Sequence, residues 1–281
     1  MLPRRILLLT VCAAALFMAP VAIWAQAAAP AKAAAPAVDQ RALDMLKKMS
    51  DALSQAKTVS FQARSMVPVR APDGTWINLY GTSQVVMQGP DKLFASTGGD
   101  FAAHDFYFDG KTITMYSPAK NLYAVKGAPA TIDAMIEEAY REEGRSFPYA
   151  DILVSEPYAV LTEGLIKAFY VGQSEIRPLA GKGSVKTDHL VFLNKEVEWQ
   201  IWIDTGDHLP RMVCATYLDD AREPSYTVEF GDWKINEAVT GDTFIFKNAT
   251  NAAKIDFRNP FRGRRMGSPG RTGAETARGA K

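Results

Sequence analysis

Strict alternation of apolar and polar residues dominates the chain and predicts β-strands. In the clearest run, at 76–88, Leu79, Val85 and Met87 share one side and polar residues occupy the other. Turn-forming pairs such as Asp73-Gly74 and Asp109-Gly110 separate such runs. About eleven strands are predicted, at 58–67, 76–88, 93–97, 104–108, 112–116, 122–125, 166–176, 186–193, 197–204, 210–218 and 225–234, with a further short one at 254–257.

Two stretches follow the period of a helix instead. The first has apolar residues at helical spacing and Asp39 as its expected N-cap; its apolar positions are Leu43, Leu46, Met49 and Leu53. The second is a helical segment inserted between strands, at about 131–161, with Gly144 as an expected C-cap. Its apolar stripe consists of Ile132, Met135, Ile136 and Ala139.

This order of elements predicts a mainly β (α+β) fold. A sheet of about eleven antiparallel strands with one dry face has to curl or be covered. We expect a single highly curved antiparallel sheet forming an open barrel, with an N-terminal helix and an inserted helical lid at its mouth. Because the helices fall within the strand order, residues 38–257 are predicted to form one domain.

The N-terminus has the pattern of a secretory signal. Arg4 and Arg5 precede an apolar run, and Ala25-Gln26-Ala27 matches the small residues that a signal peptidase cuts. We therefore predict a signal peptide at 1–27, an Ala/Pro linker at 28–37 and a periplasmic protein that does not span the membrane after cleavage. A lipoprotein signal at Cys12 is disfavoured by the bulky Val11. A retained membrane anchor stays the alternative, since about 18 apolar residues can cross a bilayer.

Charge is distributed unevenly along the chain. Residues 258–281 carry seven basic residues and one acid, whereas residues 28–257 have a net charge near −7. The C-terminal stretch is also poor in apolar residues, which predicts a disordered basic tail. An exported protein with an acidic body is not expected to bind nucleic acid. After cleavage Cys214 is the single cysteine, so no intramolecular disulfide is expected.

Candidate catalytic and metal-binding residues are few. His104, His189 and His208 do not have metal-ligand spacing, and no glycine-rich nucleotide loop precedes a helix. We predict neither a metal nor a cofactor. Asp188-His189 is the single candidate for a catalytic pair, without a serine elbow to support it. Asp204 and Asp207 are too few for a calcium site.

Apolar residues on the predicted dry face are the strongest sign of a binding site. Together with the inserted helix they would line a cavity for an acyl chain or another apolar ligand, and the several methionines suit adaptable packing. An ordinary filled core is the alternative. The candidate ligand-binding residues are Leu79, Met87, Phe106, Phe108, Met115, Met135, Ile136, Tyr140, Trp199, Ile201, Met212, Val228 and Phe230.

Several motifs in order resemble a family of predicted periplasmic proteins, a family of unknown function. They are Phe106-Tyr107-Phe108-Asp109-Gly110-Lys111-Thr112, Met115-Tyr116-Ser117-Pro118, Asn121-Leu122-Tyr123, Thr131-Ile132-Asp133, Ser155-Glu156-Pro157-Tyr158, Thr187-Asp188-His189-Leu190 and Trp199-Gln200-Ile201-Trp202-Ile203, within residues 40–257. Members of that family often have Cys before Asp-His, where this chain has Thr187. The family is similar in fold to the lipoprotein carriers of the Lol system, which implies an open barrel and lid that hold acyl chains, and no catalytic residues.

The sequence is consistent with three functions. The first is a periplasmic carrier or sensor that binds an apolar ligand, either lipid or the acyl chain of a lipoprotein. The second is a protein-binding or structural module of the envelope with a filled core. The third is a hydrolase that uses Asp188 and His189. An interior cavity favours the first function, and a solid interior favours the second.

Overall fold

The computed structural model describes residues 37–143, 149–181, 183–218 and 224–257, except for the side chains of residues 140, 142 and 143. The described residues belong to the second of two units, 1–35 and 36–281. The predicted signal peptide, almost all of the predicted linker, Gly144 and the basic tail lie outside the described residues.

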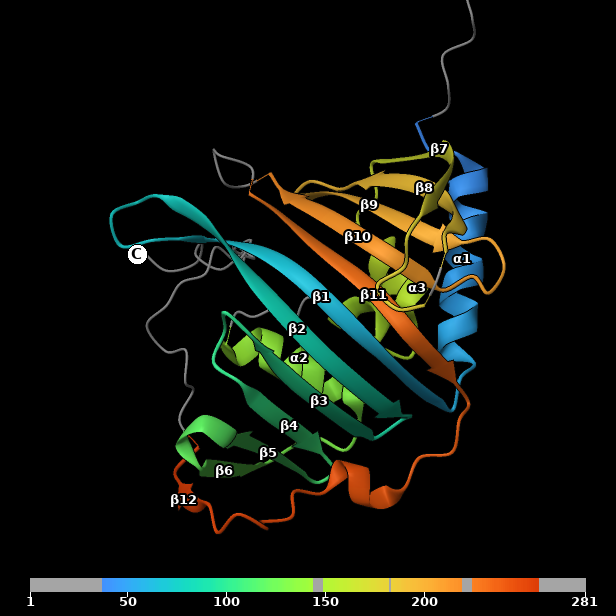
Figure 1. The fold of residues 1–281 in the computed structure, drawn as a ribbon. Helices are drawn as coiled ribbons and strands as arrows, with labels where there is room; N and C mark the ends of the chain where they lie inside the picture. The colour runs from blue at the N-terminus through green and yellow to red at the C-terminus, as the bar shows by residue number, and fades with distance from the viewer. Residues whose placement is uncertain (1–36, 144–148, 182, 219–223, 258–281) are drawn as a thin grey trace, which may run out of the picture. The chain divides into compact units, whose positions relative to one another are not determined.

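Twelve strands form one sheet in the described part of the chain, in the order β12-β6-β5-β4-β3-β2-β1-β11-β10-β9-β8-β7 (Figure 1). Neighbouring strands are antiparallel, except that β12 runs parallel to β6. The strands are β1 (Thr58–Arg70), β2 (Trp76–Gln88), β3 (Lys92–Gly99), β4 (His104–Phe108), β5 (Thr112–Ser117), β6 (Leu122–Gly127), β7 (Lys167–Ile176), β8 (Val185–Leu193), β9 (Val197–Asp204), β10 (Pro210–Tyr217), β11 (Ser225–Ile235) and β12 (Ala253–Ile255).

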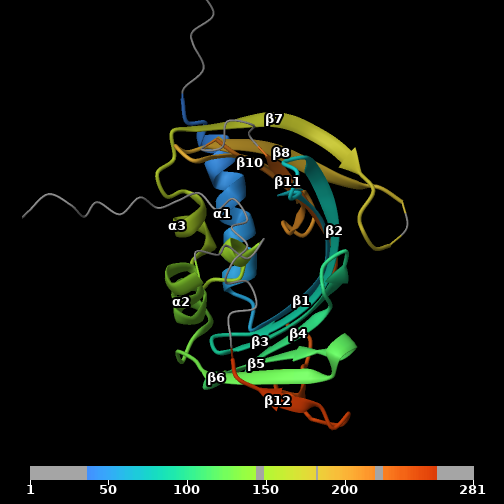
Figure 2. The same cartoon turned by 90° about the vertical axis from the view of Figure 1, so that its left-hand side faces the viewer.

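This sheet curves strongly but is not closed by hydrogen bonds, because β12 and β7 remain its two edges. Figure 2 shows the sheet as an arc, with the helices on its concave side. The predicted open, highly curved antiparallel sheet is therefore confirmed. The further short strand expected at 254–257 is present as β12, and its parallel pairing with β6 was not predicted.

The helices are α1 (Gln40–Ser54), α2 (Ile132–Glu143) and α3 (Pro157–Leu161), together with short 3₁₀ turns η1 (Pro118–Lys120), η2 (Ala150–Ile152) and η3 (Gly241–Phe244). As expected, Asp39 is the N-cap of α1 and accepts a hydrogen bond from the backbone N–H of Arg41. Leu46 and Met49 of α1 are fully buried against the concave face. The amphipathic pattern of the sequence thus places α1 against the sheet.

The core lies between the concave face and the helices. Because side chains alternate along a strand, every second residue enters this core, and the register carries the alternation from strand to strand. Phe61 of β1 pairs with Val85 of β2, and both are buried. On the other half of the sheet, Phe192 pairs with Trp199, and their rings stack with centroids 4.3 Å apart.

The convex face carries a second, smaller apolar layer that the sequence analysis did not predict. The segment 241–255, after β11, lies along this face, where Phe246 packs against a cluster of tyrosines from β4, β5 and β6. The segment ends in β12, which pairs with the edge of β6. We call residues 241–255 the C-terminal strap.

Candidate functional site

An apolar cavity of about 160 Å³ lies between the concave face of the sheet and the segments above it. Strands β2 to β5 form its floor, and α2, Tyr149 and η2 form its roof. The lining residues are Val85, Leu93, Ala95, Thr97, His104, Phe106, Met115, Met135, Ile136, Tyr149, Ala150 and Leu153. Almost every lining side chain is apolar, so the cavity suits an apolar occupant.

The register of the sheet explains how the floor is built. Ala95 of β3 lies opposite Phe106 of β4, which in turn lies opposite Met115 of β5. These three residues therefore form a row across the concave face. The next row, Thr97 and His104, is more polar and forms one end of the cavity. The space exists partly because Ala95, which lies between Val85 and Phe106 in this row, has a small side chain.

Helix α2 covers this floor with the stripe that its sequence predicts. Ile132 and Met135 are 2% and 3% exposed, and Ile136 is half-buried. Polar contacts also hold the helix. Lys126 of β6 and Glu138 are 3.5 Å apart, and the carboxylate of Asp133 accepts a hydrogen bond from the backbone N–H of Ser155. These polar contacts lie partly or fully at the surface, where ion pairs contribute about 0–1 kcal/mol, so burial of the apolar stripe dominates the attachment.

Tyr149 forms the roof beside α2 and was missed by sequence reasoning. Its ring packs edge-on against Phe61, with centroids 5.7 Å apart, and against Phe230, at 6.0 Å. Burial raises the pKa of Tyr149 above its ordinary value, although a hydrogen bond with the Ser83 hydroxyl opposes the shift. No periodic signal marks a single tyrosine in a loop, whereas the alternation of Leu93, Ala95 and Thr97 could have identified the missed floor residues.

Four of the thirteen candidate residues line the cavity: Phe106, Met115, Met135 and Ile136. Six others lie on the concave face and are buried in the core, namely Met87, Phe108, Trp199, Ile201, Val228 and Phe230. Leu79 is half-buried near the far end of the β1–β2 hairpin, on the same face. The side chain of Tyr140 lies outside the described residues.

Met212 lies on the opposite face from the one predicted. It pairs with Trp202 and Glu229, whereas its neighbour Val213 pairs with the buried Ile201. The register between β9 and β10 shifts between Pro210 and Met212, and this irregularity moves the side chains by one position. The concave positions of β10 are therefore Val213 and Ala215, so Met212 is not part of a cavity on that face.

Asp188 and His189 do not form a catalytic pair. They are adjacent in β8, so their side chains leave opposite faces of the sheet. The carboxylate of Asp188 accepts a hydrogen bond from the Tyr170 hydroxyl at 3.0 Å. The ring of His189 stacks on Trp202, with centroids 4.1 Å apart, and one ring nitrogen is 3.0 Å from the side-chain oxygen of Gln200. The structure therefore contradicts the hydrolase site proposed from the sequence.

Asp204 and Asp207 lie at the turn between β9 and β10. Both carboxylates contact the guanidinium of Arg211, which is 9% exposed. Within the ranges given above, no group of three or more His, Cys, Asp or Glu side chains is arranged to hold a metal ion.

A single curved, mostly antiparallel sheet that holds helices and an apolar cavity on its concave side defines a protein of the open-barrel class. The chain belongs to the family described as Predicted periplasmic protein (DUF2092), which it matches over residues 42–258. The resemblance seen in the sequence is thereby confirmed. No curated protein matches the chain.

Solved structures of similar fold include three from bacteria. The lipoprotein LppX of Mycobacterium tuberculosis is 13% identical, with a TM-score of 0.40 over 73% of this chain and 100% of that chain. The Pseudomonas aeruginosa MucA/MucB complex is 14% identical, with a TM-score of 0.39; the match covers 74% of this chain and 61% of that chain. A LolA superfamily protein from Nitrosomonas europaea is 8% identical, with a TM-score of 0.33; the match covers 73% of this chain and 97% of that chain. Among the helices of the described residues, none has the length and hydrophobicity needed to cross a membrane.

Proposed function

We propose that this protein binds an apolar ligand, a lipid or the acyl chain of a lipoprotein, on the concave face of its sheet and acts as a carrier or sensor. The cavity of about 160 Å³ beneath α2, which is lined almost completely by apolar side chains, is the main support for this proposal. Burial of an acyl chain there contributes about 0.8 kcal/mol for each methylene. Eight methylenes would contribute roughly 6 kcal/mol before the costs of association.

The size of the cavity indicates how binding would proceed. Pockets that enclose small molecules usually measure about 300–1,000 Å³, so a space of about 160 Å³ holds only part of a long chain. Helix α2 would have to move outward to admit the rest. Its contacts with the sheet are mainly Ile132, Met135 and Ile136, so α2 would act as the lid over the site.

Titration with a fluorescent fatty acid tests the proposal. Ala95→Phe should fill the floor and weaken binding at least about tenfold, because the added ring occupies the space of the ligand. Val86→Phe is the matched control, since Val86 pairs with Phe94 on the convex face. We expect the control to bind like the wild type. If the wild type does not bind the probe, or if Ala95→Phe and Val86→Phe bind it with the same affinity, the concave face is not the site.

The small volume also favours a second candidate function. A protein-binding or structural module of the envelope would need no ligand, and the same residues would then be a nearly filled core. That function predicts that the wild type binds no fatty acid and that Ala95→Phe stabilises the fold by filling a void. The titration and a urea melt of the same variant distinguish the two functions.

We further propose that the protein is exported and cleaved after Ala27, since Ala25-Gln26-Ala27 has the small residues of a cleavage site. The family description as predicted periplasmic supports export. N-terminal sequencing of the periplasmic protein should give Ala28 as the first residue. An intact Met1 in the membrane fraction would contradict cleavage.

A further inference from the structure

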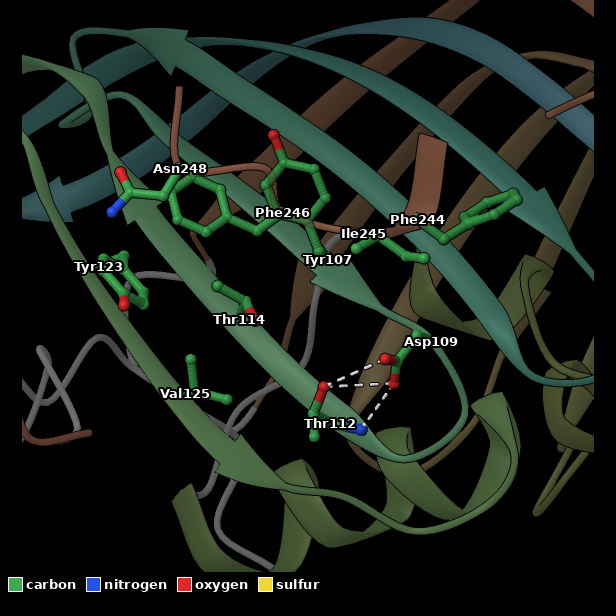
Figure 3. Close-up of a pocket in the computed structure, with 10 residues that line it drawn as sticks. All are labelled: Tyr107, Asp109, Thr112, Thr114, Tyr123, Val125, Phe244, Ile245, Phe246 and Asn248. Atoms are coloured by element: carbon green, nitrogen blue, oxygen red, sulfur yellow. Dashed lines mark hydrogen bonds between the residues drawn. The ribbon is translucent and has the colours of Figure 1, made fainter. Parts of the chain in front are cut away.

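A second cavity lies on the convex face, behind the floor of the apolar cavity. It measures about 210 Å³ and lies between the outer sides of β4, β5 and β6 and the C-terminal strap. Figure 3 shows Tyr107 and Phe246 side by side along one wall, Thr114 in the middle, and Asp109 with Thr112 at the end away from Tyr123. The same strands therefore present two cavities, with Phe106 and Met115 on one side and Tyr107 and Thr114 on the other.

Aromatic rings surround one end of this convex cavity. Phe246 of the strap lies 5.7 Å from Tyr107, 5.0 Å from Tyr116 and 5.0 Å from Tyr123, measured between ring centroids. The face of such a ring carries partial negative charge, and several rings together attract an organic cation. The hydroxyls of Tyr107 and Tyr123 form no hydrogen bond with any of the described residues.

A carboxylate occupies the other end. One oxygen of Asp109 accepts hydrogen bonds from the backbone N–H groups of Lys111, at 2.9 Å, and Thr112, at 2.7 Å. Among the described residues, the second oxygen accepts one hydrogen bond, from the Thr112 hydroxyl at 3.3 Å. Partial burial opposes ionisation of Asp109, but the backbone hydrogen bonds from Thr112 and Lys111 outweigh it and lower the pKa. Asp109 is therefore a fixed negative charge at neutral pH.

The lining contains no compensating positive charge. None of the ten residues that line the cavity is Lys, Arg or His. Lys247 lies between two lining residues in the sequence, but its ammonium group is paired with Asp242. An anion would therefore be repelled, and a purely apolar chain would leave Asp109 and the hydroxyls of Thr112 and Thr114 facing it.

We propose that the convex cavity is a binding site for a small organic ammonium ion of the choline or ethanolamine type. The rings of Tyr107, Tyr123 and Phe246 contact the ion at one end of the cavity, and the carboxylate of Asp109 at the other end attracts its positive charge. This site is separate from the apolar cavity, because the sheet lies between them. The ion can reach the site as a free solute or as the headgroup of a lipid.

Calorimetric titration with choline tests the site, with the neutral isostere that has carbon in place of nitrogen as the reference ligand. Asp109→Asn keeps an acceptor oxygen for the turn but removes the charge, and it should weaken choline binding about five- to tenfold. The matched control is Asp73→Asn, since Asp73 likewise accepts a backbone hydrogen bond in a turn, from Thr75, but lies in the β1–β2 turn. The control should change the affinity less than about twofold.

Tyr123→Leu is a second variant, which removes a ring without touching the turn, and it should also weaken choline binding. Vesicles of phosphatidylglycerol with and without phosphatidylethanolamine show whether the ion is taken as a lipid headgroup, and selective binding of either source supports the site. Equal binding of choline and its neutral isostere, no binding of choline together with no preference for vesicles that contain phosphatidylethanolamine, or unchanged affinity in both Asp109→Asn and Tyr123→Leu would overturn the proposal.

Discussion

Two tryptophans three positions apart in β9 have opposite surroundings, and this difference is directly measurable. Trp199 is 8% exposed and stacks on Phe192 in the core, whereas Trp202 lies on the convex face against His189. Trp199→Ala should therefore lower the free energy of unfolding by about 3–5 kcal/mol, and Trp202→Ala by about 1 kcal/mol. Urea melts of the two variants check this. Equal costs would mean that the register of β9 is wrong.

A buried acid predicts how stability depends on pH. Burial raises the pKa of the Asp151 carboxyl in η2 above its ordinary value. Below that value the group is protonated in both the folded and the unfolded state and contributes nothing. As the pH rises, the unfolded state loses this proton first. The free energy of unfolding therefore falls between the pKa of Asp151 in the unfolded state and its higher pKa in the folded state.

Asp151→Asn removes this cost, and its stability relative to the wild type should increase from pH 4 to pH 7. Asp73→Asn is the control: hydrogen bonds from Thr75 lower the pKa of Asp73, so both states of the protein lose this proton at lower pH, and the stability difference of Asp73→Asn should stay nearly constant over this range. Thermal melts across this range measure both differences. A constant difference for Asp151→Asn would show that Asp151 titrates alike in the folded and unfolded states.

Prediction from the sequence worked best where the side-chain alternation was regular. The bounds of β2, β4 and β9 agree with the pattern residue for residue, and Trp199 and Ile201 fall on the expected face. It failed at Met212, because an irregular register before that residue leaves no trace in hydrophobicity. It predicted the short strand at the end of the strap but not the packing of Phe246, because no hydrophobic period marks the contacts of that residue.

At the scale of elements, α2 is the segment whose motion the proposed function requires. It is attached along one side, whereas β1 is hydrogen-bonded to β2 and β11 on both of its edges. Backbone amides of α2 should therefore exchange hydrogen faster than those of β1, and a bound fatty acid should slow the exchange in α2. Mass spectrometry of exchanged peptides measures both effects. Exchange in α2 as slow as in β1 would favour the filled-core function.

The C-terminal strap is expected to contribute to stability, whereas the residues after it are not. Residues 258–281 have few apolar side chains, so a chain ending at Phe257 should keep the melting temperature of the full protein within about 2 °C. A chain ending at Thr240 also loses Phe246, the buried Phe244 and β12. We expect its melting temperature to fall by roughly 10 °C or more. Similar melting temperatures for both truncations would show that the strap does not stabilise the sheet.

For residues 37–257 as a whole, the open sheet is the feature that would allow the proposed binding. A closed barrel would fix the volume inside it, but the edges β7 and β12 are not paired with each other, and helices rather than strands cover the concave face. The interior can therefore change volume when a helix moves, without breaking hydrogen bonds between strands. The sequence predicted this architecture because its strands alternate and its helices interrupt them. It could not predict the cavity volume, which depends on how Ala95 and Tyr149 pack against α2.

The most direct test of the central claim is mass spectrometry of lipids that remain bound to the native protein after purification from the periplasm. If the concave cavity binds an apolar ligand, the wild type should retain an acyl-containing lipid at a fixed molar ratio. The ratio should be much lower for Ala95→Phe and unchanged for Val86→Phe. Absence of bound lipid from the wild type, or the same ratio in all three proteins, would contradict the claim that the concave cavity binds an apolar ligand.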